Sequence, residues 1–178
     1  MPHTRGVALA MTAPVDSYKF LSYGTRKLVE AWTRREPRRE IPWTSLPGPL
    51  SRCRLALVST AGLAMATDRP FDQEGEVRNP WWGDPSFRVI PQDADPRDVR
   101  IYHLHMETRY AEEDLDCVLP LRRLAELARA GEVGEPAPSH FSFMGYILDP
   151  TALLRDTVPE MIRVLHREEV DAVLLIPF

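Results

Sequence analysis

Two histidines one residue apart are the first side chains of this sequence that could do chemistry. His103 and His105 lie in the segment IYHLH, and residues two apart in an extended strand project from the same face. Such a pair fits three roles: binding a metal such as zinc, transferring a proton to a substrate, or making structural hydrogen bonds. The spacing alone leaves all three open. A third metal ligand would come from Asp93, Asp95, Glu107, Asp114 or His140.

A second group of polar residues lies among aromatic ones in APSHFSFMGYILDP, residues 137–150. Because this pattern fits neither a helix nor a regular strand, we expect a loop that lines a small-molecule pocket. The alternative is a loop whose aromatic side chains fill the core. The residues predicted to face the pocket are His140, Ser142, Met144 and Tyr146.

The third candidate is the turn STAG, residues 59–62, which follows an apolar run. Small residues after a parallel strand let backbone N–H groups approach an anion such as a carboxylate. We therefore expect Ser59, Thr60 and Gly62 to contact a substrate. An ordinary turn is the alternative, since the segment has no fuller glycine-rich fingerprint.

The elements that must position these residues follow the order of an α/β protein. Continuous apolar runs at 55–58 and 172–176 predict buried strands in central, parallel positions. Further strands and helices are expected at 87–91, 99–105, 121–131 and 151–168, the last interrupted at Pro159. We predict a three-layer α/β fold, with a mainly parallel sheet flanked by helices.

The first part of the chain has a different character. A helix is expected over 17–35, followed by a proline-rich linker at 36–52. We therefore divide the chain into an N-terminal helix and extended arm, residues 1–50, and an α/β domain, residues 51–178.

Composition narrows the functional classes. The 178 residues have a net charge of −4, which argues against a general nucleic-acid-binding protein, and the basic cluster RREPRR at 34–39 is interpreted as a solvated surface segment. No run of 18 apolar residues exists, so no membrane span is expected. Two cysteines, Cys53 and Cys117, do not make a disulfide framework. A cytoplasmic protein with buried or incidental thiols is predicted.

Four stretches together resemble the glycine, sarcosine, betaine and D-proline reductase family of selenoprotein B subunits and their cysteine homologues. They are LALVSTAGL (55–63), FRVIPQDADPRDVRIYHLH (87–105), CVLPLRRLAELARAGEVGEPAPSHFSFMGYILDP (117–150) and VDAVLLIPF (170–178). HFSFMGYI and the RVIP…D stretch are the most specific of these, and the arm matches more weakly.

The resemblance implies reductive cleavage of a C–N bond in a small amine or amino acid. In that family a partner subunit has a pyruvoyl group that binds the substrate amine, and a selenolate or thiolate attacks the α-carbon and expels the amine. The resemblance implies no cofactor or metal in this chain itself, and it implies an oligomeric assembly. The histidines in the family-like stretches, which would protonate the leaving nitrogen, are His103, His105 and His140.

The chain departs from the family pattern at one place. The family's redox selenocysteine or cysteine comes just after the strand that resembles 170–178, and this chain lacks it. Three explanations remain open: a selenocysteine codon read as a stop, a natural fragment, or a redox-inactive homologue that binds a ligand or acts as a scaffold. We expect the substrate-site subunit of a reductase that is active only with the missing motif. A metal-dependent hydrolase or lyase at His103 and His105 is a third alternative.

Overall fold

The computed structural model describes residues 21–34, 40, 44–79, 82–104 and 107–178. The chain divides into two compact units, residues 1–44 and residues 45–178. The first unit contains helix α1 (Tyr23–Thr33), and the hydroxyl of Ser22 accepts a hydrogen bond from the backbone N–H of Thr25 at 3.2 Å. This is the bond of a typical N-cap. A helix is confirmed within the predicted range 17–35, but it covers Tyr23–Thr33, and the described residues Leu21 and Ser22 precede it.

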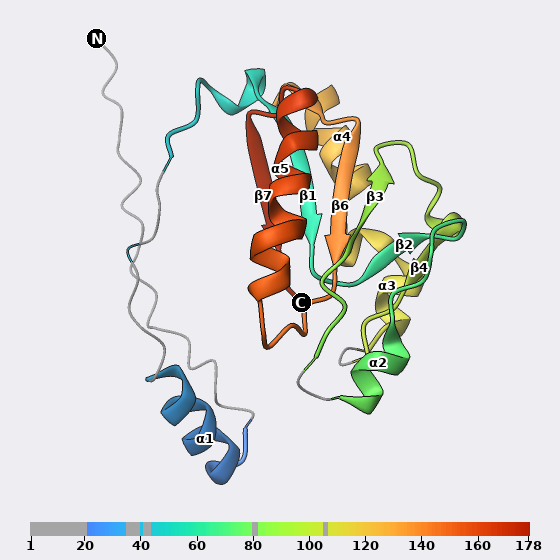
Figure 1. The fold of residues 1–178 in the computed structure, drawn as a ribbon. Coiled ribbons are helices and arrows are strands. Elements are labelled where there is room, and N and C mark those ends of the chain that lie inside the picture. The colour runs from blue at the N-terminus through green and yellow to red at the C-terminus, as the bar shows by residue number, and fades with distance from the viewer. Residues whose placement is uncertain (1–20, 35–39, 41–43, 80–81, 105–106) are drawn as a thin grey trace. The chain divides into compact units, whose positions relative to one another are not determined.

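The second unit is built on a five-stranded sheet with β1 (Arg54–Ser59) at its centre (Figure 1). Strand β7 (Ala172–Ile176) pairs with one side of β1, in parallel. On the other side, β5 (Glu135–Pro136) pairs with the start of β1 and β6 (Ser139–Phe143) with its end, both in parallel. Strand β3 (Phe87–Pro91) then pairs antiparallel with β6. The predicted mainly parallel sheet is confirmed.

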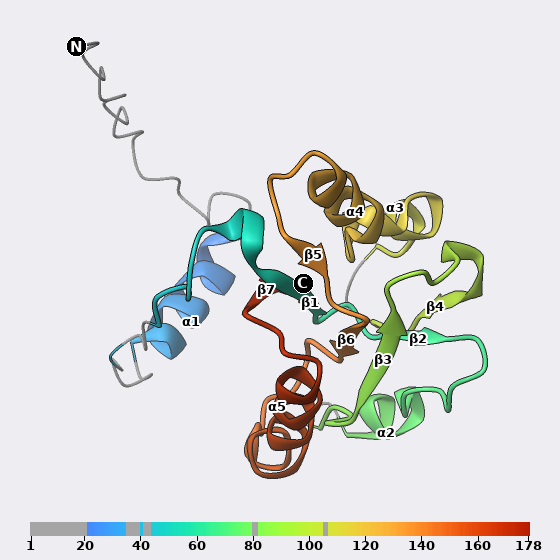
Figure 2. The ribbon, with the colours of Figure 1, turned by 90° about the horizontal axis from the view of Figure 1, so that it is seen from above.

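Helices cover both faces of this sheet (Figure 2). On one face α5 (Val158–Arg167) buries Met161 against Val58 and Phe141. On the other face the core around Leu57 includes side chains of α3 (Arg109–Glu113) and α4 (Leu121–Arg129). The predicted three-layer α/β fold is therefore confirmed.

The predicted helix at 151–168 has the expected irregularity. A π-helical turn, η4 (Leu153–Thr157), runs directly into α5. Pro159 is in the first turn of α5, where its missing N–H costs least. Because proline cannot donate to the preceding turn, the change of helical geometry falls just before it.

The remaining elements are short. Strands β2 (Leu63–Met65) and β4 (Val99–Ile101) form a separate antiparallel pair. None of the described helices has both the length and the apolar character needed to cross a bilayer. The other elements are α2 (Gln73–Arg78), η1 (Leu50–Arg52), η2 (Pro96–Asp98) and η3 (Leu115–Cys117).

Three expectations were wrong. The segment expected as a loop contains strand β6, because its polar side chains bond the backbone inside the fold. The strand expected at 99–105 ends at Ile101, which pairs with Leu63, the first residue of its three-residue antiparallel partner β2. The strand expected in a buried central position at 172–176 is an edge strand: the described residues place no strand beyond β7, and Val173, Leu174 and Leu175 are 39%, 46% and 69% exposed.

Two leucines in adjacent strands allow a test of this difference between centre and edge. Leu57 in β1 is fully buried, whereas Leu175 in β7 is mostly exposed. We expect Leu57→Ala to lower the free energy of unfolding by about 2–5 kcal/mol, because it leaves a cavity. Leu175→Ala should change it by less than about 0.5 kcal/mol. Urea unfolding of both variants measures this, and equal losses would contradict the edge position of β7.

Candidate active site

The carboxyl ends of β1 and β7 are joined by Thr60, the residue that follows β1. Its N–H donates to the carbonyl oxygen of Ile176 at 3.1 Å. Its hydroxyl accepts from the N–H of Phe178 at 2.7 Å and lies 3.1 Å from the main-chain oxygen of Phe178, to which it can donate. In open α/β sheets, ligands bind beyond the carboxyl ends of parallel strands. This edge is therefore where we place the candidate site.

Gly145, two residues after β6, lets three segments meet at this edge. A Cβ atom at Gly145 would lie 2.6 Å from the main-chain oxygen of Phe178, 3.0 Å from that of Thr60 and 3.1 Å from Nε2 of His103. Only a glycine fits such distances without a shift of the backbone. Thr60, His103 and Phe178 thus converge on Gly145, a residue that sequence reasoning did not include among the site residues.

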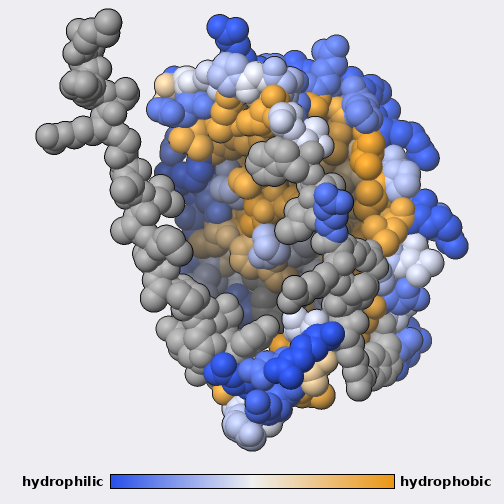
Figure 3. Space-filling view, turned by 90° about the vertical axis from the view of Figure 1, so that its left-hand side faces the viewer, coloured by the Kyte–Doolittle hydropathy of each residue, from blue (hydrophilic) through white to orange (hydrophobic). Residues whose placement is uncertain are grey.

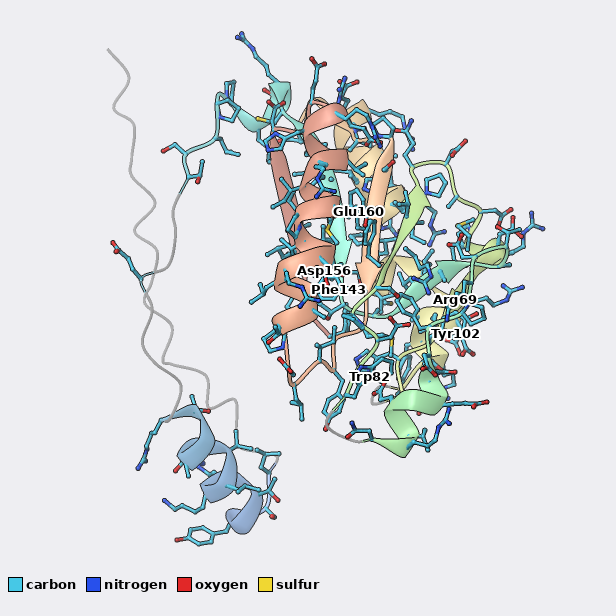
Figure 4. The ribbon with its side chains drawn as sticks, viewed as in Figure 1. Arg69, Trp82, Tyr102, Phe143, Asp156 and Glu160 are labelled. Carbon is cyan, nitrogen blue, oxygen red and sulfur yellow. The ribbon has the colours of Figure 1, made fainter. Side chains whose placement is uncertain are left out.

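His103 reaches the edge from the end of β4, and it is buried. The N–H of its neighbour Tyr102 donates to the carbonyl oxygen of Gly62 at 2.9 Å. Gly62 has a φ of +63°, and a Cβ there would lie 2.5 Å from Sδ of Met144. The glycine is therefore required both by its backbone conformation and by its close neighbours. Tyr102 and Phe143, next to His103 and Met144 in the chain, are labelled in Figure 4.

The two candidate serines hold the turn that follows β1. The hydroxyl of Ser142 accepts from the N–H of Leu63 at 2.8 Å and donates to the carbonyl oxygen of Ser59 at 3.1 Å. The hydroxyl of Ser59 accepts from the N–H of Ala61 at 3.2 Å. Both serines are fully buried. Their geometry supports positioning of Thr60 and Gly62 rather than direct contact with a ligand.

His140 lies in the interior, on β6. Its Nδ1 accepts a hydrogen bond from the N–H of Leu57 at 3.0 Å, and no part of the residue is exposed. Burial lowers the pKa of His140 to about 4, so the ring is neutral at pH 7. Since Nδ1 is the acceptor, the proton of the neutral ring is on Nε2. Among the described residues Nε2 has no hydrogen-bond partner.

Of the remaining candidates, Tyr146 contacts a different segment of the chain. Tyr146 is half-buried, and its carbonyl oxygen is so close to Gly83 that a Cβ there would clash. His105 lies outside the described residues, so its pairing with His103 stays a prediction. Within the described ranges no three His, Cys, Asp or Glu side chains are grouped to hold a metal ion.

The two cysteines lie in different elements, before β1 and at the end of η3. Cys53 is buried at the start of β1, the opposite end of the strand, with Sγ 3.5 Å from the carbonyl oxygen of Pro49. Cys117 is exposed, at the end of η3. The thiol of Cys53 is therefore not placed to attack a ligand bound beside Thr60 and His103.

A surface hollow beside this region is built from charged residues. Arg88 crosses it and bonds inward, donating to the carbonyl oxygens of Arg69 and Pro70 at 2.8 and 3.1 Å and lying 4.2 Å from the ring centre of Phe71. Its guanidinium is therefore used to hold the loop before α2. Arg69 and Trp82 mark this hollow in Figure 4, and its lining also includes Asp68, Asp72, Asp84 and Ser86.

The interior position of His140 gives a prediction about pH. Below pH 6.5 the unfolded chain takes up a proton that folded His140 binds only near pH 4, so stability falls as the pH falls through this window. The group accounts for a loss of about 1.4 kcal/mol per pH unit, and about 3 kcal/mol between pH 7 and pH 4. His140→Gln should flatten this part of the stability curve, measured by urea unfolding.

The matched control is His166→Gln, because His166 is exposed on α5. This variant should keep the slope of the unmodified chain between pH 7 and pH 4. A His140→Gln protein with an unchanged slope would show that His140 ionises normally in the folded state.

Comparison with known proteins gives one informative match. The chain is 35% identical over 133 residues to D-proline reductase subunit gamma of Acetoanaerobium sticklandii. The aligned region is 75% of this chain and 52% of that subunit, so the chain spans about half the length of the curated relative it matches. No protein-family model and no solved structure matches the chain. The similarity relates the chain to a reductase subunit.

Proposed function

We propose that this chain forms the substrate-site part of a reductase subunit that cleaves a C–N bond of a small amino acid, with D-proline as the first candidate substrate. The observation that carries the proposal is the 35% identity over 133 residues to a D-proline reductase subunit. Its name makes that relative one subunit of a larger assembly, and we propose the same for this chain.

The geometry of the strand ends supports the proposal. Thr60 lies between β1 and β7 at the carboxyl edge of the sheet, and Nε2 of His103 lies beside Gly145 at the same place. The N–H groups of this turn are bonded within the fold and Nε2 of His103 is buried. A substrate at this edge would therefore meet the partly exposed Thr60 first, and would reach His103 only after a shift of the strand ends. Histidine is suited to donate a proton near neutral pH. We propose His103 as the group that protonates the leaving nitrogen and Thr60 as the residue that contacts the substrate, while the buried Gly62 holds the turn in place.

The reaction consumes two electrons and two protons. A selenolate or thiolate attacks the α-carbon, and the electrons of the Cα–N bond stay on the nitrogen, which takes a proton. A thiol then attacks the selenium or sulfur, and the released α-carbon takes the second proton. A dithiol supplies the electrons and leaves as a disulfide. With D-proline the ring opens, and the product is 5-aminopentanoate.

The nucleophile and the electron sink are proposed to come from outside this chain. Cys53 lies at the opposite end of β1 from the candidate edge. We propose that the nucleophile is a selenocysteine or cysteine in the part of the reductase that this chain does not span. A pyruvoyl group on a partner subunit would supply the electron sink that activates the leaving nitrogen. The residues of this chain then bind the amino acid, hold it at the strand ends and move the proton.

The direct test combines sequencing of the gene with an activity assay of the complete reductase. The nucleotide sequence that follows the Phe178 codon is read first: an in-frame UGA with coding sequence after it supports a reductase subunit. The complete reductase is then purified from its native host and incubated with D-proline and a dithiol. Release of 5-aminopentanoate supports the proposed function. An intact assembly that cleaves no C–N bond of D-proline, glycine, sarcosine or betaine would refute it.

Gly145 offers a prediction specific to the site. Gly145→Ala places a Cβ 2.6 Å from the main-chain oxygen of Phe178 and must displace the strand ends or His103. In the complete reductase we expect kcat/KM for D-proline to fall at least about tenfold, which is about 1.4 kcal/mol of transition-state stabilisation. Steady-state kinetics and circular dichroism measure this change and show that the fold persists.

The matched control is Gly48→Ala, the same chemical change at an exposed glycine with no atom within 4 Å of the added Cβ. It should leave kcat/KM unchanged. Full activity of the Gly145→Ala reductase would remove this edge of the sheet from the proposed site.

A further inference from the structure

The outer edge of β7 is an unusual surface for the end of a sheet. Among the described residues β7 pairs with β1 alone, so its other edge presents backbone groups without a strand partner. Natural proteins protect such edges with charged residues, proline or a short irregular strand. The five residues of β7 are instead all aliphatic, AVLLI. Nothing in the sequence of this strand discourages pairing with another one.

The side chains of β7 are uncovered on both faces of the sheet. Val173 pairs with Ala56, and Leu175 pairs with Val58. These side chains project from the face of the sheet that α5 covers at Val58 and Phe141. Leu174 lies opposite Leu57 and projects from the other face. Figure 3 shows apolar residues gathered on this side of the second unit. A strand that is apolar on both faces is the pattern of an internal strand of a three-layer fold.

The extent of this surface points to an occupant within the same subunit. The exposed parts of three aliphatic side chains are far smaller than the roughly 800 Å² that each partner buries in a stable interface between separate proteins. A connected segment needs no such area, because the connection supplies a high effective concentration. The relative offers such a segment, since about half of its length lies outside the match.

We propose that β7 is an internal strand of the complete subunit, and that the next strand belongs to the part of the reductase subunit that this chain does not span. That strand pairs with the outer edge of β7, and apolar side chains around it cover Val173 and Leu175 on one face and Leu174 on the other. That a further part of the subunit exists rests on the proposed function. The position of its strand rests on the exposed edge and side chains of β7.

Hydrogen exchange measured by mass spectrometry tests the pairing. The samples are the 178-residue chain alone, kept dilute and monomeric, and the complete subunit purified in its assembly. We expect exchange in the peptide that contains residues 172–176 to be at least a hundredfold slower in the complete subunit. Equal exchange in the two samples overturns the proposal, whether or not the assembly reduces D-proline. A host that produces no polypeptide longer than these 178 residues overturns it as well.

Two other occupants would also give slow exchange, and both overturn the proposal. If β7 of the isolated chain is protected only at concentrations where sedimentation shows a dimer, the occupant is a second copy. If β7 is already protected in the dilute monomer, the occupant is residues 1–44 of the same chain. The isolated chain therefore separates both cases from a strand of the missing part.

A charge on the edge gives an independent readout. Leu175→Lys should leave the urea midpoint of the isolated chain unchanged, because this side chain is 69% exposed there. In the complete subunit it should restore fast exchange at residues 172–176 and reduce the yield of folded subunit at least about tenfold, since it buries an unpaired charge. The control is Val77→Lys on α2, where the valine is 70% exposed. A Leu175→Lys subunit that behaves like the control overturns the proposal.

Discussion

The structure depends on satisfying the backbone of β1, a strand buried on both faces with neighbours on both sides. A buried N–H group without a partner costs free energy comparable to a lost hydrogen bond. The neighbour on one side is interrupted, because β5 ends at Pro136 and β6 begins at Ser139. The N–H of Leu57 faces this interruption, and Nδ1 of His140 accepts its hydrogen bond. One imidazole therefore completes the pairing of the central strand, and it must be neutral to do so.

Buried polar side chains also fix the backbone at the carboxyl end of the sheet. Ser142, two residues after His140, bonds the backbone on both sides of the turn that follows β1, at Ser59 and Leu63. The turn places Thr60 between the ends of β1 and β7. Residues whose types suggest chemistry in the sequence thus hold the backbone in place. The edge itself is formed by a threonine, by main-chain oxygens and by close approach at Gly145.

The periodicity of apolar residues correctly predicted the elements in which apolar side chains face the core and polar side chains face solvent. The helix at 121–131, the strand at 87–91 and the central strand at 55–58 all appear as expected. It failed at β6 because His140 and Ser142 are as fully buried as Phe141, so the polar positions do not mark a solvent face. Hydrogen bonds from side chains to a neighbouring backbone leave no periodic signal. Gly145 was missed as a site residue for a similar reason, since its role is visible only as distances to segments far away in the chain.

The error at β7 has a different origin. An apolar run shows that a strand is suited to burial on both faces, but it does not say which polypeptide buries it. The interpretation of 172–176 as a central strand was thus correct about the chemistry of the strand and wrong about its neighbours in this chain. Phe178 connects the uncovered strand to the candidate site. It follows β7 and Pro177 in the chain, and its N–H donates a hydrogen bond to Thr60. The proposed covering strand would therefore lie beside the same strand end that Thr60 holds at the candidate site, so that the completed sheet and the site share one edge.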